Sequence, residues 1–195
     1  EALDKIEELD IAIPENIEKI EFYKSQVIIC DGIMTFAKRY SDLAYEMAQK
    51  ETNEKRKAEL IKIGDVCKKV PAYPPESFYE AIQFIWFVQV GGIICENPLS
   101  LNPGRFDQYM YPYYEKDIKE GKLDKDGALE LIEALWIKYS EWVWTISENT
   151  AGYFAGYNQF QNLTVGGRKR DGSDATNDLT YLCLQATKDV KTHQP

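Results

Sequence analysis

The sequence is poor in the residues that build metal sites and nucleophilic catalytic sets. Its 195 residues include one histidine, His193, and four cysteines that are widely and irregularly spaced. Without a Cys-x-x-Cys pair or a second imidazole, we expect no zinc site and no other bound metal. A Ser-His-Asp or Cys-His set cannot be assembled around a lone histidine that has no visible partner. Residue chemistry therefore assigns no catalytic residue to this chain.

Positive charge is also scarce. The chain has 23 Lys and Arg against 32 Asp and Glu, which gives a net charge of −9 and a pI of about 4.8. A nucleic-acid binder would need a basic face, so this class is disfavoured. We find no signal peptide and no apolar run long enough to cross a bilayer, so no membrane partner is expected. Small molecules and other proteins stay open as partners.

The cysteines bear on the compartment. Each lies in a mostly apolar or helical stretch, which is typical of buried free thiols: Cys30, Cys67, Cys95 and Cys183. Unpaired thiols fit a reducing, cytoplasmic compartment. The abrupt beginning and end of the chain suggest a piece of something longer.

Apolar residues recur at three- and four-residue intervals, which predicts a mainly helical chain. We expect one or two short helices in residues 1–29, with Pro14 as a breaker, and a last helix capped by Ser173 or Asp174. Residues 162–165, closed by two glycines, predict one strand of a sheet that is completed elsewhere. The longer helices are expected at residues 33–50, 53–70, 77–94 and 124–147.

Residues 98–114 interrupt this pattern with Pro, Gly, Asn and Ser, four tyrosines and one Arg/Asp pair. Such a loop either faces a ligand or is a packed connection. Arg105 could hold a carboxylate, or it could tie the loop to a helix end. The Gly166-Gly167-Arg168-Lys169-Arg170 run lacks both the Walker and the Rossmann spacing, so a solvated basic turn is favoured over a phosphate cradle.

Several blocks, in order along residues 36–195, resemble the glycyl radical enzymes, the pyruvate formate-lyase-like family. The most diagnostic is Pro103-Gly104-Arg105-Phe106-Asp107-Gln108-Tyr109. Two further blocks are Gln161-Asn162-Leu163-Thr164-Val165-Gly166-Gly167 and Asp174-Ala175-Thr176-Asn177-Asp178-Leu179. The resemblance implies an α/β fold, a ten-stranded barrel wrapped by helices, of which this piece is mostly α-helical. Residues 1–95 would be a helical region, and residues 96–195 the start of the barrel and a wall of the pocket.

The resemblance also implies a cofactor and partners. A radical S-adenosylmethionine activating enzyme would generate a glycyl radical, which passes to a cysteine at the barrel centre, and the enzyme would be a homodimer. Neither radical element is found in this sequence, so both would lie outside it. The run Tyr153-Phe154-Ala155-Gly156-Tyr157 echoes the glycyl loop but has no Arg before Phe154, and we reject it as the radical site.

By position in the family, Phe160 resembles an aromatic residue that contacts substrate, and Ser100 a polar pocket residue. Leu99 stands where some family dehydratases carry a histidine, which argues against a glycerol- or diol-type substrate. Residues 149–151, 154–160 and 192–195 are most similar to the hydroxyproline dehydratase-like members. A plain core role for Phe160 remains the alternative.

These features predict a glycyl radical lyase that eliminates water from a small polar substrate such as hydroxyproline. A decarboxylase or a C–N or C–S lyase of the same family is the nearest alternative. A non-catalytic helical interaction domain is the alternative from another class.

Overall fold

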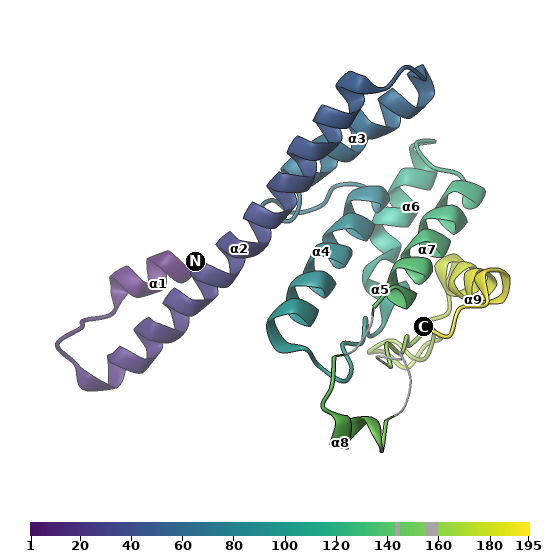
Figure 1. Ribbon diagram of the computed structural model, residues 1–195. Helices are drawn as coiled ribbons and strands as arrows, with labels where there is room; N and C mark the ends of the chain where they lie inside the picture. Colours follow the sequence, from purple (N-terminus) through teal and green to yellow (C-terminus); the bar gives the residue numbers. More distant parts are fainter. Residues whose placement is uncertain (143–144, 155–159) are drawn as a thin grey trace. The chain divides into compact units, whose positions relative to one another are not determined.

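The computed structural model describes residues 1–142, 145–154 and 160–195. These form two compact units, Glu1–Pro74 and Pro75–Pro195. In the first unit, α1 (Ala2–Glu8) lies beside the beginning of the long helix α2 (Pro14–Lys50), and α3 (Glu54–Lys69) lies beside its end (Figure 1). The second unit holds six helices in its described part, and it contains the candidate site.

We expected separate helices within residues 1–29 and at residues 33–50, but α2 runs through this region without a break. It runs for 37 residues, and Pro14 occupies its first turn instead of breaking it. Proline is tolerated there because the first N–H groups of a helix have no intrahelical acceptor. Gly32 is accommodated inside the helix, with nothing within 4 Å of the place where a Cβ would stand.

Small residues allow α2 and α3 to approach closely. Ala37, Ser41 and Ala44 are buried on α2, and the Ser41 hydroxyl donates to the Gly64 carbonyl of α3 at 2.7 Å. A Cβ at Gly64 would stand 2.8 Å from the Tyr45 ring. The core of this unit is therefore a close contact between two helix backbones, fixed by one buried hydrogen bond.

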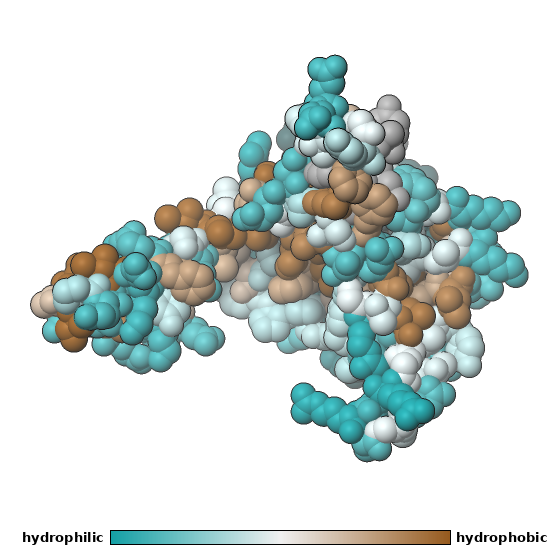
Figure 2. All heavy atoms as spheres, turned by 90° about the horizontal axis from the view of Figure 1, so that it is seen from below, coloured by the Kyte–Doolittle hydropathy of each residue, from teal (hydrophilic) through white to brown (hydrophobic). Residues whose placement is uncertain are grey.

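Helix α1 adds no buried side chain to this core. Leu3, Ile11 and Ile13 around it are exposed. Figure 2 shows apolar side chains gathered at this end of the α1–α2 pair. We expect α1 to be the least stable element of the unit, because little apolar surface is buried beneath it.

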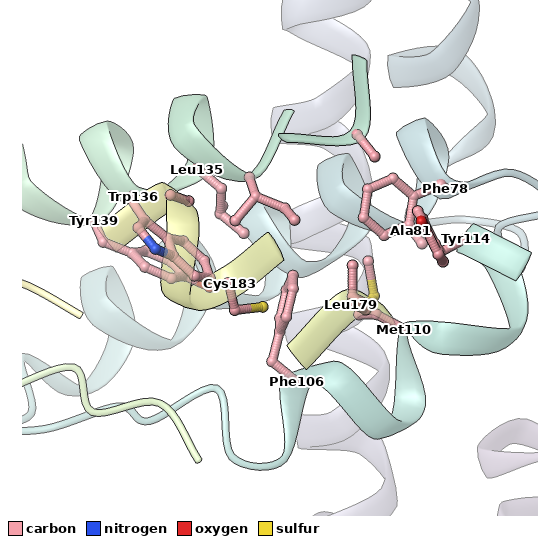
Figure 3. Close-up of a cluster of buried hydrophobic side chains, with 13 residues drawn as sticks. Phe78, Ala81, Phe106, Met110, Tyr114, Leu135, Trp136, Tyr139, Leu179 and Cys183 are labelled. Atoms are coloured by element: carbon pink, nitrogen blue, oxygen red, sulfur yellow. The ribbon is translucent and has the colours of Figure 1, made fainter. Parts of the chain in front are cut away.

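The second unit is built around α4 (Phe78–Glu96), α7 (Lys125–Ser140) and α9 (Asp178–Val190). Shorter helices lie between them: α5 (Phe106–Tyr109), α6 (Tyr111–Lys119) and α8 (Glu148–Ala151). Figure 3 shows aromatic side chains from α4, α5, α6 and α7 meeting Leu179 and Cys183 of α9. Phe106 and Trp136 form an edge-to-face pair, with ring centroids 5.5 Å apart. The diagnostic Pro-Gly-Arg-Phe-Asp run is thus anchored in the core by its Phe106 ring.

Residues 98–114 were expected to be irregular, but α5 and the start of α6 lie within them. Pro112 falls in the first turn of α6, where it does not disrupt hydrogen bonding. Helix α7 ends at Ser140, before the expected residue 147. The next aromatic ring, Trp142, packs on Trp86 with centroids 5.6 Å apart. Val143, within the helix expected at residues 124–147, lies outside the described residues.

The helix starts follow local capping chemistry. Ser77 and Asp124 accept hydrogen bonds from the first turns of α4 and α7, so the helices expected from residues 77 and 124 are capped at those residues. The expected cap of the last helix at Ser173 or Asp174 is wrong, because Asn177 forms a capping box with Thr180. The Asp174 carboxylate instead accepts from the Thr176 N–H at 2.9 Å, an Asx turn ahead of the helix.

Two composition-based expectations are also corrected. Within the described residues, α4 alone is long and apolar enough to cross a membrane by length and composition. Its buried residues Phe78 and Ala81 belong to the aromatic core, but only 39% of its apolar window is buried, and Val88 and Ile94 are exposed. Of the four free cysteines, Cys67 and Cys183 are buried, whereas Cys30 and Cys95 are exposed.

Candidate functional site

Two stretches that are distant in the sequence run side by side at the candidate site. Gly104 pairs with Leu163 as an isolated parallel bridge, and the Thr164 N–H donates to the Gly104 carbonyl at 2.9 Å. The strand expected at residues 162–165 is represented by this single bridge within the described part of the chain. One bridge leaves most polar backbone groups of both stretches to be satisfied by side chains.

Asp107 links the two stretches by hydrogen bonds. Its carboxyl group is fully buried, and Oδ2 accepts from the Gly166 N–H at 2.7 Å and, at very short range, from the Thr180 hydroxyl. The Asp107 carbonyl accepts from the Asn177 side chain at 3.0 Å. One residue of α5 therefore holds both the Gly166 turn and the first turn of α9.

Arg105 fastens the same turn from outside. Its Nη2 donates to the Gly166 carbonyl at 2.8 Å and to the Arg168 carbonyl at 3.3 Å. Gly166 and Gly167 both have positive φ, which suits glycine. We expected Arg105 either to hold a carboxylate or to tie the loop to a helix end. In the structure it ties the loop, but its acceptors belong to a glycine turn and not to a helix end.

The structure brings together the two residues expected to contact substrate, although 60 positions separate them. The Ser100 hydroxyl lies 2.8 Å from the Phe160 carbonyl oxygen and 2.8 Å from Asn102 Oδ1, so its proton can serve either acceptor. The Asn162 N–H donates to Asn102 Oδ1 at 2.8 Å. Ser100 therefore meets the backbone of Phe160, while the Phe160 side chain remains partly exposed, at 40%.

The backbone of Phe160 is left-handed, with φ at 50°. This conformation costs a bulky residue roughly 1–2 kcal/mol and persists only where surrounding contacts hold it. Such a strained position is typical of sites where a side chain must be aimed in a particular direction. Two other described non-glycine residues, Asn97 and Lys191, also have positive φ, but they are the C-caps of α4 and α9, whereas Phe160 lies outside a helix end.

Sequence reasoning missed the residues that hold this loop. Gln89 is buried in α4 and donates to the Leu101 carbonyl at 2.7 Å. A Cβ at Gly92 would stand 2.7 Å from Leu101 Cδ2, so the loop approaches the helix closely. A glutamine and a glycine within an otherwise apolar helix were the available signals. Leu99, which stands where some dehydratases of the family carry a histidine, is exposed on the same loop.

Thiol chemistry is not available from the buried cysteines. Burial raises the pKa of Cys67 to about 11, and burial together with the nearby Asp107 raises the pKa of Cys183 to about 12. Both are thiols at neutral pH, and a thiol is neither a nucleophile nor a good metal ligand. No group of three or more His, Cys, Asp or Glu side chains that could hold a metal ion occurs among the described residues. Residues 155–159, part of the rejected glycyl-loop echo and of the hydroxyproline-type resemblance, lie outside the description.

Comparisons with known proteins identify the family and the fold of the chain. The family described as pyruvate formate lyase-like matches residues 1–195. The chain belongs to this family, and the predicted family and fold class are confirmed.

Individual relatives include both lyases and dehydratases. The chain is 43% identical to an isethionate sulfite-lyase of Nitratidesulfovibrio vulgaris over 100% of its own length and 24% of that protein. It is 36% identical to a trans-4-hydroxy-L-proline dehydratase of Clostridioides difficile over 88% of this chain and 22% of that one. The chain thus spans about a quarter of the length of the curated relatives it matches.

Solved structures show the same fold. A protein structure solved in a study of 1,2-propanediol dehydration in Roseburia inulinivorans matches with a TM-score of 0.95 and 45% identity. The match covers 100% of this chain and 23% of the chain in that structure. The hydroxyproline dehydratase of Clostridioides difficile, with trans-4-hydroxy-L-proline bound, matches with a TM-score of 0.94 and 34% identity, covering 100% and 25%. The fold is that of the corresponding segment of these enzymes.

Proposed function

We propose that the protein to which this chain belongs is a glycyl radical lyase that eliminates water from a small polar substrate such as hydroxyproline. Family membership over residues 1–195 supports the class of enzyme. The similarity to the hydroxyproline and propanediol dehydrating enzymes supports dehydration.

The observation that carries the proposal is the pairing of Ser100 with Phe160. A strained, partly exposed aromatic residue held by a hydroxyl from a distant loop is an arrangement that can present an apolar face to a substrate. We assign both residues to substrate binding, with residues 96–195 as the start of the barrel and one wall of the pocket. No residue of this chain is assigned a role in bond cleavage.

A second reaction has specific support. The isethionate sulfite-lyases are more than 35% identical to this chain, which makes C–S cleavage the alternative to dehydration. A decarboxylase is also among the relatives, at 36% identity. A non-catalytic helical domain is the remaining alternative. It requires the complete sequence to lack a catalytic cysteine loop or a C-terminal glycyl radical loop.

The cofactor and partners follow from the proposed class. The glycyl radical would be formed outside this segment by a radical S-adenosylmethionine activating enzyme. We place the enzyme in the cytoplasm as a homodimer, without membrane or nucleic-acid partners. The acidic composition is consistent with this assignment.

The test uses the full-length protein, activated anaerobically by its activating enzyme. We expect a glycyl radical signal by electron paramagnetic resonance and water elimination from trans-4-hydroxy-L-proline or a related substrate. Sulfite release from isethionate would move the assignment to C–S cleavage, and failure to form a radical would refute the enzyme proposal.

Site variants test the pocket assignment. Burying an aromatic side chain against a bound substrate typically contributes about 1.5–3 kcal/mol of apolar binding, so Phe160→Ala should raise KM roughly ten- to hundredfold. The control Phe22→Ala removes a phenylalanine that is 58% exposed in the first unit, and it should leave KM unchanged. A Phe160→Ala enzyme with wild-type KM would make Phe160 an ordinary packing residue.

A further inference from the structure

Gln194 is a buried polar residue within the stretch 192–195, to which the resemblance assigned no role. Only 3% of it is exposed. Its Nε2 donates to the Tyr139 carbonyl at 3.1 Å, and its Oε1 accepts from the Gln161 N–H at 3.0 Å. Both ends of the side-chain amide are therefore engaged by backbone groups from two other parts of the chain.

The backbone of Gln194 is itself fixed. Its carbonyl accepts from the Thr192 hydroxyl at 2.7 Å and from the Ser140 hydroxyl at 3.4 Å. Ser140 and Tyr139 form the last turn of α7, and the Tyr139 ring stacks on Trp136 in the aromatic core, with centroids 5.9 Å apart. Gln194 thus extends the rigid end of α7 toward the loop at residue 161.

The other end of this connection is the strained residue of the candidate site. Gln161 directly follows Phe160, so the peptide group joining them has its N–H held by Gln194 and its carbonyl, that of Phe160, faced by Ser100 at 2.8 Å. A left-handed bulky residue relaxes unless its peptide neighbours are restrained. Two side chains that are far apart in the sequence, Ser100 and Gln194, restrain this one peptide group.

We propose that Gln194 is a positioning residue, which aims the Phe160 ring at the substrate by clamping the Phe160–Gln161 peptide group to the end of α7. The inference rests on the proposed function. It assigns Gln194 no contact with substrate, and its effect on binding passes through Phe160.

The first test replaces the amide by an apolar group of similar size in the full-length, activated enzyme. In Gln194→Leu, both hydrogen bonds of the clamp are lost and the Phe160 ring is free to turn away. We expect KM to rise about tenfold with kcat changed less than about twofold, as when a contact common to ground and transition states is removed. The control is Gln185→Leu, which removes a half-buried glutamine of α9 that bonds the exposed Asp189 at 2.7 Å, and we expect it to behave as wild type.

A double-variant cycle separates positioning from general structural damage. If Gln194 acts through the Phe160 ring, Gln194→Leu should have no further effect on KM in a Phe160→Ala background. A KM rise of equal size in both backgrounds overturns the proposal. So does an unchanged KM in Gln194→Leu when the wild-type enzyme is active.

Hydrogen exchange tests the clamp without relying on activity. The amide hydrogens of residues 161–165 should exchange at least about tenfold faster in Gln194→Leu than in Gln185→Leu, because a lost tether allows local opening. Equal exchange overturns the proposal. If Gln194→Leu does not fold, Gln194→Asn, whose amide is one methylene shorter, is judged by the same criteria. A wild-type enzyme that carries its radical but converts none of the substrates refutes the proposed function, and exchange still decides the clamp.

Discussion

Removing the Asp107 side chain should strongly destabilise the second unit. Oδ2 of this buried carboxyl group accepts from the Gly166 N–H at 2.7 Å and from the Thr180 hydroxyl. Asp107→Ala leaves both donors buried without this acceptor. An orphaned buried polar group costs about 1–3 kcal/mol. The Thr180 hydroxyl recovers part of its loss, because Asn177 Oδ1 lies 3.5 Å away.

We therefore expect Asp107→Ala to lower the free energy of unfolding by about 2–4 kcal/mol, a large fraction of a typical domain's stability. Asp107→Asn keeps one acceptor oxygen and should cost roughly half as much. Asp189→Ala, an exposed carboxylate in the last turn of α9, is the matched control and should change stability by less than about 0.5 kcal/mol.

Urea unfolding of the 195-residue chain, followed by tryptophan fluorescence, measures this change in the free energy of unfolding directly. All four tryptophans of the chain lie in the second unit, so the signal reports on that unit. The reasoning is refuted if Asp107→Ala unfolds at the same urea concentration as Asp189→Ala. A loss in Asp107→Asn equal to that in Asp107→Ala would mean that shape, and not hydrogen bonding, sets the effect.

Two further predictions concern packing and thiol reactivity. Gly64→Ala should destabilise the first unit by about 1–3 kcal/mol, since its Cβ would stand 2.8 Å from a Tyr45 ring whose hydroxyl is held by Asp65. Gly32→Ala, with nothing within 4 Å, should instead stabilise α2 by up to about 1 kcal/mol, and circular dichroism during urea unfolding checks both signs. At pH 8 the raised pKa of Cys183, about 12, leaves about one thiolate in ten thousand, so iodoacetamide should label exposed Cys95 and not Cys183. Equal labelling of the two by mass spectrometry would contradict the burial of Cys183.

Helices were the most predictable part of the fold. The regions of α3 and α4 follow from their apolar periodicity, and α4 and α7 begin within one residue of the expected positions 77 and 124. These signals are local, since both a cap and a helical stripe depend on residues three or four positions apart. The errors at Pro14 and Pro112 have the same local origin, because proline begins a helix as readily as it ends one.

The sequence suggested residues for the candidate site but not their arrangement. The family resemblance named Ser100 and Phe160, and their roles as substrate contacts remain predictions. That the Ser100 hydroxyl faces the Phe160 carbonyl could not be foreseen, because a hydrogen bond between residues 60 positions apart leaves no periodic trace. Nor could the left-handed backbone at Phe160, since no glycine or asparagine marks it.

By itself the sequence determined the family and the helical character of the chain, because motifs and apolar spacing depend only on residues that are near one another in the sequence. Tertiary structure decided which buried polar groups meet. Asp107, Gln89 and Gln194 look like ordinary helix or loop residues until folding places an unsatisfied N–H or carbonyl beside each one. Burial then makes each of those hydrogen bonds obligatory, and this requirement holds the loop of the candidate site in one conformation.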